Sequence, residues 1–216
     1  MAEVLTQIEH DPLVVHTSPA LEMDDAQFFE FCRINHDLRI ERTAKGDLVI
    51  MPPAGGSSGL GNARLTYVFS EWAHREGRGR VFDSSTGFKL PNGATRSPDV
   101  SWVRNERIMR LTDEEFEKFL PLCPDFVLEL HSPSDPLRGV KDKMEEYMAN
   151  GARLGWLLDP VGKQVHVYRS GRPPEILDQP SQISGAPVLK GFVLDVPQIW
   201  GVMERKGDER RKSVKS

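Results

Sequence analysis

The chain has 216 residues, 38% of them hydrophobic, and a formal net charge of −4 at pH 7. This length and apolar content suffice for one sizeable core, so we expect a single domain with appended ends. The negative charge argues against a protein that coats nucleic acid through bulk positive charge, and no run approaches the roughly 18 apolar residues of a membrane span.

The beginning of the chain predicts a polar arm followed by a helix. Residues 1–20 are polar and contain proline, so we expect a flexible N-terminal arm, which lacks the continuous apolar segment of a signal peptide. An amphipathic helix then runs from Asp24 to about Asn35. Cys32 and Cys123 lie far apart in the sequence, which predicts two free thiols in a reducing cytoplasm.

A hairpin and a second helix are expected next. The strand-like segments 38–42 and 47–51 flank a turn that ends in Gly46, and residues 55–59 (Gly-Gly-Ser-Ser-Gly) predict a flexible loop. The following helix buries one face, because its apolar residues recur at i, i+3, i+4 and i+7. These apolar residues are Leu65, Val68, Phe69 and Trp72.

Short strands are then predicted at residues 80–82 and 86–90. Further along, Thr112 is placed to cap a helix over residues 113–120, with Glu115 at the capping-box position.

The most informative segments are two strands that carry acids, residues 97–103 and 125–131. Each sets an acid in an apolar run, where an unpaired charge is expensive unless it meets a cation. Because strand side chains alternate between faces, Asp99 shares a face with Ser101 and Val103, and Glu129 shares one with Val127 and His131. The two acids can therefore converge if the strands are neighbours. Such a carboxylate pair suits Mg²⁺, which prefers hard oxygen ligands and keeps several waters.

The second half of the chain interleaves helices and strands. A helix over 140–150 should end at Gly151, and strands are expected at 154–158, 164–168, 175–177 and 191–196. This order predicts an α/β fold with a mixed (α+β) sheet that is flanked by helices. We expect the domain to span residues 21–203 and the charged residues 204–216 to form a disordered tail.

The helix over residues 140–150 offers a lysine to the acid pair. Its apolar face contains Val140, Met144 and Tyr147, and Lys141 and Lys143 lie on opposite edges of that face. Either lysine could reach a site at the sheet boundary, and both could instead extend to solvent.

The combined motifs resemble the Uma-two family of bacterial endonucleases, which belongs to the PD-(D/E)XK, or restriction-endonuclease-like, superfamily. The resemblance covers about residues 22–200. It rests on Ser97-Pro98-Asp99, Glu129-Leu130-His131-Ser132-Pro133-Ser134-Asp135, Lys143-Met144-Glu145-Glu146-Tyr147, Asn150-Gly151 and Trp156-Leu157-Leu158-Asp159-Pro160, with Phe82 to Phe88 and Gly191 to Leu194 as further segments.

The resemblance implies a restriction-endonuclease-like core and a set of site residues. Asp99 is similar to the first acid and Glu129 to the second, and the carbonyl of Leu130 would be a further metal ligand. The superfamily pattern places a lysine two residues after the second acid, where this chain has His131. In the family this lysine has moved to the following helix, which matches Lys143.

Two auxiliary residues follow from the same comparison. Glu41 resembles an early acid that some superfamily members contribute to metal binding, although a solvated strand glutamate is the alternative. His131 is a candidate proton shuttle because its ordinary pKa is near neutrality, or a spacer with a hydrogen bond to the sheet edge.

The implied activity is Mg²⁺-dependent hydrolysis of DNA phosphodiester bonds, with Mn²⁺ as a substitute metal. The metal would polarise the scissile phosphate and activate a water, and Lys143 would orient that water or stabilise developing charge. The resemblance also implies a homodimer, as for many enzymes of this fold. The two free thiols predict a cytoplasmic protein, and the lack of a long apolar run predicts one without a membrane span.

Two other functions compete with this prediction. One is a nuclease fold kept as a catalytically inactive binding or regulatory module, which the net acidity and His131 favour. The other is a serine hydrolase, because residues 55–59 match the G-x-S-x-G pattern. Pro52 and Pro53 disturb the sharp strand-to-helix turn that this pattern requires, so the sequence argues against a hydrolase of that kind.

Overall fold

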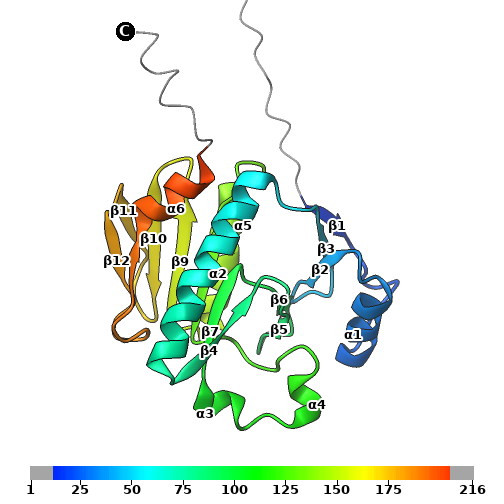
Figure 1. The fold of residues 1–216 in the computed structure, drawn as a ribbon. Helices are drawn as coiled ribbons and strands as arrows, with labels where there is room; N and C mark the ends of the chain where they lie inside the picture. Colours follow the sequence, from blue (N-terminus) through cyan, green and yellow to red (C-terminus); the bar gives the residue numbers. More distant parts are fainter. Residues whose placement is uncertain (1–11, 205–216) are drawn as a thin grey trace, which may run out of the picture.

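The computed structural model describes residues 12–204 and has a mixed sheet with helices on both faces (Figure 1). The helices are α1 (Asp25–Ile34), α2 (Gly56–Glu76), α3 (Asn105–Ile108), α4 (Asp113–Phe116), α5 (Leu137–Ala149) and α6 (Val196–Met203). The strands are β1 (Leu13–Val15), β2 (Arg39–Arg42), β3 (Leu48–Met51), β4 (Gly79–Asp83), β5 (Phe88–Lys89), β6 (Thr95–Arg96), β7 (Val100–Arg104), β8 (Phe126–Leu130), β9 (Leu154–Asp159), β10 (Gln164–Arg169), β11 (Glu175–Asp178), β12 (Gln182–Ser184) and β13 (Val193–Asp195).

The central sheet has the strand order β11-β10-β9-β8-β7-β4. Its neighbours are antiparallel except for β8 and β9, which are parallel and joined through α5. Every residue of β8 and β9 is buried, as expected of strands that are covered on both faces. The predicted α/β fold with a mixed sheet and flanking helices is therefore confirmed.

The two faces of the central sheet carry separate cores. One core packs α2 and α6 against the sheet through Leu65, Phe69, Trp156 and Ile199, and both helices lie in front of the sheet in Figure 1. The other core packs Met144 of α5 against the opposite face. The predicted inward faces of α2 and α5 are thus the buried ones.

A second sheet lies at the side of the central sheet, with the strand order β1-β3-β2-β6-β5 (Figure 1). The predicted hairpin is its β2–β3 pair, and the pairing joins Glu41 to Val49. A small core of Phe28, Ile40 and Leu48 attaches α1 to this sheet. The second sheet matters for function because β2 carries Glu41 and β6 carries Arg96.

The expected flexible loop at residues 55–59 is wrong, because these residues form the first turn of α2. The amide of Gly59 donates to the carbonyl of Gly55 at 2.9 Å, and the Ser57 hydroxyl donates to the carbonyl of Met203 at 3.0 Å. Glycine weakens a helix, but the buried stripe further along α2 supports this one. Because the Ser57 hydroxyl is bonded to a backbone carbonyl and not to a histidine, this segment is not a serine nucleophile elbow.

The helix predicted over residues 113–120 is also shorter than expected. Thr112 and Glu115 form the predicted capping box, yet α4 ends at Phe116. The chain leaves the helix because Leu120 pairs with the strand region around Phe88, exchanging backbone hydrogen bonds of 3.0 and 2.8 Å with Gly87 and Lys89. The sequence reasoning also missed α3, β6, β12 and α6.

The ends of the chain are described in part. Residues 13–15, within the predicted N-terminal arm (1–20), form β1 and pair with β3. The remaining residues of the arm up to 11, and residues 205–216 of the predicted tail, lie outside the described residues, so the domain bounds 21–203 stay a prediction. Across residues 12–204, none of the helices combines the length and the apolar character needed to cross a membrane. Cys32 and Cys123 are both free.

Candidate active site

The two predicted acids stand opposite each other at one end of the β7–β8 ladder. Val100 pairs with Leu128, so the next step of this antiparallel register places Asp99 opposite Glu129. The amide of Leu130 donates to Oδ2 of Asp99 at 2.9 Å, which ties the two strand ends together. Both acids are nearly covered, with exposed fractions of 8% for Asp99 and 6% for Glu129.

The predicted alternation of side chains is confirmed by the two cores. Val100 and Leu128 belong to the core under α2, whereas Val103 and Val127 belong to the core under α5. Glu129, two residues after Val127, therefore faces α5.

Of the two lysines that the sequence left open, Lys143 is the one that reaches Glu129. Its Nζ lies 3.0 Å from Oε1 of Glu129 and 2.8 Å from Oε1 of Glu41. Burial lowers the pKa of Lys143, but the charges of Glu129 and Glu41 outweigh this effect and raise the pKa, so the ammonium stays charged. Lys141 forms no ion pair within residues 12–204; it lies near His166, whose pKa is lowered by burial and by that charge.

Tyr147, one turn after Lys143, adds a neutral donor to the same carboxylate. Its hydroxyl donates to Oε1 of Glu129 at 3.0 Å. Burial and the charges of Glu129 and Glu41 raise the pKa of Tyr147, so the phenol keeps its proton. Residues four apart share one face of a helix, and α5 thereby presents both groups to Glu129.

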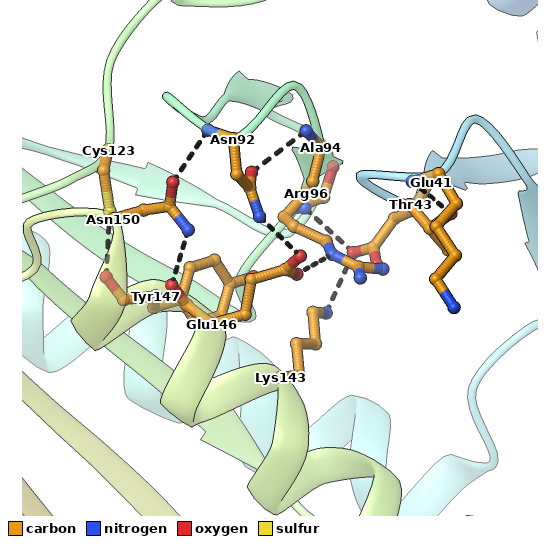
Figure 2. Close-up of polar contacts among 12 residues, drawn as sticks. Glu41, Thr43, Asn92, Ala94, Arg96, Cys123, Lys143, Glu146, Tyr147 and Asn150 are labelled. Carbon is orange, nitrogen blue, oxygen red and sulfur yellow. Dashed lines mark hydrogen bonds and ion pairs between the residues drawn. The ribbon is translucent and has the colours of Figure 1, made fainter.

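Glu41 is not a solvated strand glutamate but a buried member of the site, with an exposed fraction of 2%. Its Oε1 accepts from the amide of Ser97 at 2.9 Å and from Lys143, and its Oε2 accepts from Nη1 of Arg96 at 3.2 Å. Arg96 in turn donates through Nε to Glu146 at 2.6 Å. Figure 2 shows the resulting chain of contacts from Glu146 through Arg96 and Glu41 to Lys143.

The charges around Glu41 and Glu129 shift their pKa values in opposite directions. Burial favours protonation of Glu41, but Lys143, Arg96 and the Ser97 amide outweigh it and lower the pKa of Glu41. Burial raises the pKa of Glu129 to about 7, since the negative charges of Asp99 and Glu41 add to it and Lys143 only partly offsets it.

The pKa of Asp99 is raised as well. Burial raises its pKa more than the Leu130 amide and the nearby cations lower it. A positive charge bound beside these two acids would offset the cost of ionising them in a buried site.

His131 acts as an anchor in this structure. Its Nδ1 lies 3.0 Å from Oδ1 of Asp159, and its Nε2 lies 2.8 Å from the carbonyl oxygen of Asp135. Burial favours protonation of Asp159, but hydrogen bonds from His131 and from the amides of Val161 and Gly162 outweigh it and lower its pKa. With both ring nitrogens engaged, His131 joins the end of β9 to the loop that leads into α5. This geometry fits the spacer interpretation of His131.

Asn62 and Arg39 contact Asp99, and the sequence reasoning missed both. Nδ2 of Asn62 in α2 donates to Oδ1 of Asp99 at 3.1 Å, and Nη2 of Arg39 in β2 lies 3.8 Å from the same atom. A signal existed for each. Asn62 continues the buried stripe of Leu65 and Phe69 backward by three residues, and Arg39 shares a strand face with Glu41.

The protein's own groups fit a hard divalent cation only with additional ligands. Within the described part of the chain, no cluster of three or more acidic, histidine or cysteine side chains is arranged to hold a metal. The available donors are the carboxylates of Asp99 and Glu129 and the backbone carbonyl of Leu130. Since the N–H and C=O of one strand residue point to the same side, and the Leu130 amide points to Asp99, its carbonyl also points toward that edge. This oxygen set suits Mg²⁺, which retains several waters.

Comparisons with known proteins agree with this arrangement. A search of curated proteins gave no match. A matching solved structure is described as a putative nuclease belonging to DUF820 from Anabaena variabilis; it aligns with a TM-score of 0.66 and 19% identity over 76% of this chain and 91% of that one. At this identity the match shows the fold alone. The model of the family Uma2, described as putative restriction endonuclease, matches residues 25–197. The chain therefore belongs to the Uma2 (Uma-two) family, whose description supports a nuclease function.

Proposed function

We propose that the protein is a metal-dependent endonuclease that hydrolyses phosphodiester bonds of DNA. The observation that carries this proposal is the convergence of Asp99 and Glu129 at one strand end, with the Lys143 ammonium 3.0 Å from Glu129. The family description supports a nuclease, and the choice of DNA, Mg²⁺ and these residues is our inference from the site.

Asp99, Glu129 and the carbonyl of Leu130 would hold Mg²⁺, with Mn²⁺ as a substitute. When bound, the metal would polarise the phosphate and lower the pKa of a water molecule. The amide donors on Asp99, from Leu130 and Asn62, fix the direction of its carboxylate. Such fixed ligands hold the metal without reorganisation during the reaction.

Lys143 would orient the attacking water or stabilise negative charge on the phosphate. Its ammonium has three donors, and Glu41 and Glu129 accept two of them. The third is available to a water or a phosphate oxygen. Each oxygen of Glu41 already contacts a cationic side chain, Lys143 at 2.8 Å and Arg96 at 3.2 Å, so we assign Glu41 to positioning Lys143 and not to binding the metal.

The test is nicking of supercoiled plasmid DNA in the presence of Mg²⁺ or Mn²⁺. We expect cleavage by the wild-type protein and none after removal of the metal with EDTA. Asp99→Ala should abolish cleavage, whereas Asp37→Ala, at an exposed position, should leave it unchanged. The proposal fails if several DNA and RNA substrates stay intact at millimolar Mn²⁺.

The alternative function is a nucleic-acid binding or regulatory module without catalysis. The ion pairs of Lys143 with two glutamates favour it, because they satisfy the site's charges without a metal. Binding of DNA without cleavage under all metal conditions would support this alternative. A homodimer and a location in the cytoplasm remain parts of the proposal for either function, and light scattering of the purified protein tests the dimer.

A further inference from the structure

Arg39 makes fewer and longer contacts with carboxylates than Arg96 and Lys143, the other two cations of the site. Arg96 and Lys143 each contact two carboxylates at 3.2 Å or less. Within residues 12–204, Arg39 has one carboxylate contact, with Asp99, at 3.8 Å. Its side chain is also the most exposed of the three, at 35% against 13% for Arg96 and 15% for Lys143.

The hydrogen bonds of Arg39 are equally incomplete. A guanidinium has five N–H donors in a planar fork. Nη2 of Arg39 donates to the carbonyl of Ser97 at 3.2 Å. Its Nε is buried and has no hydrogen-bond partner in the described part of the chain. A buried donor without an acceptor costs free energy. Among the described residues, the protein therefore holds the guanidinium beside Asp99 but supplies an acceptor to few of its donors.

The location of Arg39 is specified by the fold. Arg39 begins β2, two residues before Glu41, so both side chains are on the same face of the strand. Glu41 is fixed by the Ser97 amide and by Arg96. Strand β2 thus positions Lys143 through Glu41 and also places Arg39 next to Asp99.

We propose that Arg39 binds a backbone phosphate of the nucleic-acid substrate beside Asp99. This inference rests on the proposed function for its substrate class. A phosphate would accept hydrogen bonds from the guanidinium donors that the protein leaves uncovered, since guanidinium and phosphate match in a planar, bidentate geometry. Bound there, it would lie next to the acid assigned to the metal. Arg39 is then a substrate-positioning residue that the sequence motifs do not include.

The experiment measures binding of a short DNA duplex without turnover, in Ca²⁺, by fluorescence anisotropy over a series of salt concentrations. Arg39→Gln should weaken binding roughly tenfold or more, because a charge-assisted hydrogen bond is lost, and should reduce the salt slope by about one phosphate contact. Arg39→Lys should restore the slope while binding less tightly than wild type, since it keeps the charge and loses the fork. Arg33→Gln removes the same charge from an exposed helix position and should change neither quantity.

The outcomes separate this inference from the proposed function. If Arg39→Gln binds DNA with the wild-type affinity and slope, Arg39 does not bind the phosphate, whether or not the wild-type protein cleaves. If the wild-type protein binds DNA without cleaving it, and Arg39→Gln loses the phosphate contact, the assignment of Arg39 holds while the nuclease proposal fails. If the wild-type protein does not bind DNA, both fail. A loss of binding by Arg39→Gln that Arg39→Lys does not correct in slope would show a structural effect and overturn the assignment.

Discussion

Replacing Glu129 by glutamine is expected to stabilise the metal-free protein at alkaline pH. Burial and the neighbouring acids raise the folded-state pKa of Glu129 from 4.5 to about 7. An acid whose pKa is raised by folding contributes stability that is fully present below its unfolded pKa and is lost as the pH rises through its folded pKa. Above about pH 7 the wild-type protein must keep this carboxylate ionised in a covered site. Glutamine has the same shape and still accepts from Tyr147 and Lys143, but it carries no charge.

The magnitude follows from the two pKa values. The difference between 4.5 and about 7 corresponds to roughly 3 kcal/mol in full. Most of this free energy, roughly 2–3 kcal/mol, is lost between about pH 5 and pH 8. The free energy of unfolding of Glu129→Gln, relative to wild type, should therefore rise by about this amount over the same pH range.

Urea unfolding in EDTA at the two pH values measures this quantity. Glu106→Gln is the matched control, because its side chain is 76% exposed, and it should show no comparable pH dependence. Adding Mg²⁺ at the higher pH should then stabilise the wild-type protein but not Glu129→Gln, since a ligand stabilises only the form that binds it. The stability of Glu129→Gln relative to wild type could instead stay constant or fall as the pH rises. Either result would refute the explanation that folding makes ionisation of Glu129 unfavourable.

Three further outcomes are expected. Lys143→Ala should inactivate the proposed cleavage of plasmid DNA while Lys141→Ala mainly weakens DNA binding, because Nζ of Lys143 alone of the two contacts Glu129; equal effects on cleavage would refute the assignment. Gly79→Ala should lower the free energy of unfolding in urea by roughly 1–3 kcal/mol, because an added Cβ would lie 2.3 Å from the Trp102 ring. Gly59→Ala has open space around it and should instead raise that free energy by about 0.5–1 kcal/mol. The reverse order of stabilities would contradict the packing. Burial raises the pKa of the Cys32 thiol to about 11 and that of the Cys123 thiol to about 12. Both thiols should therefore react slowly with a thiol reagent in the native protein and rapidly in urea. Rapid labelling of Cys123 in the native protein would contradict this expectation and show that its site opens.

The sequence allowed the acid pair to be predicted because it depends on local periodicity. Alternation along a strand decides which side chains share a face, so Glu129 of β8 shares a face with Val127 and lies opposite Leu128 and Leu130. The helical period of 3.6 residues predicted the buried stripes of α2 and α5 in the same local way. Such patterns are visible in one strand or helix alone, without knowledge of what lies beside it.

Contacts between distant segments could not be predicted in this way. Arg96 lies in a two-residue strand that has no periodicity of its own, and its role follows from the pairing of β6 with β2, which brings it to Glu41. The end of α4 depends on Leu120 pairing with the strand at Phe88. The glycines at the start of α2 indicated a loop by local propensity, and the packing of the rest of the helix overrides that preference.

Because Lys143 lies on helix α5, Glu41 has a specific role in positioning it. Where the superfamily pattern has a strand lysine, this chain has His131, whose two ring nitrogens contact Asp159 and the Asp135 carbonyl. Lys143 reaches Glu129 from α5, which packs on the face where Glu129 points. A lysine carries about 2 kcal/mol of rotamer entropy, and a single carboxylate leaves much of that freedom. Glu41, itself fixed by Ser97 and Arg96, supplies the second contact that holds the ammonium in place. We therefore infer that Glu41, held by Ser97 and Arg96, positions the lysine that α5 supplies.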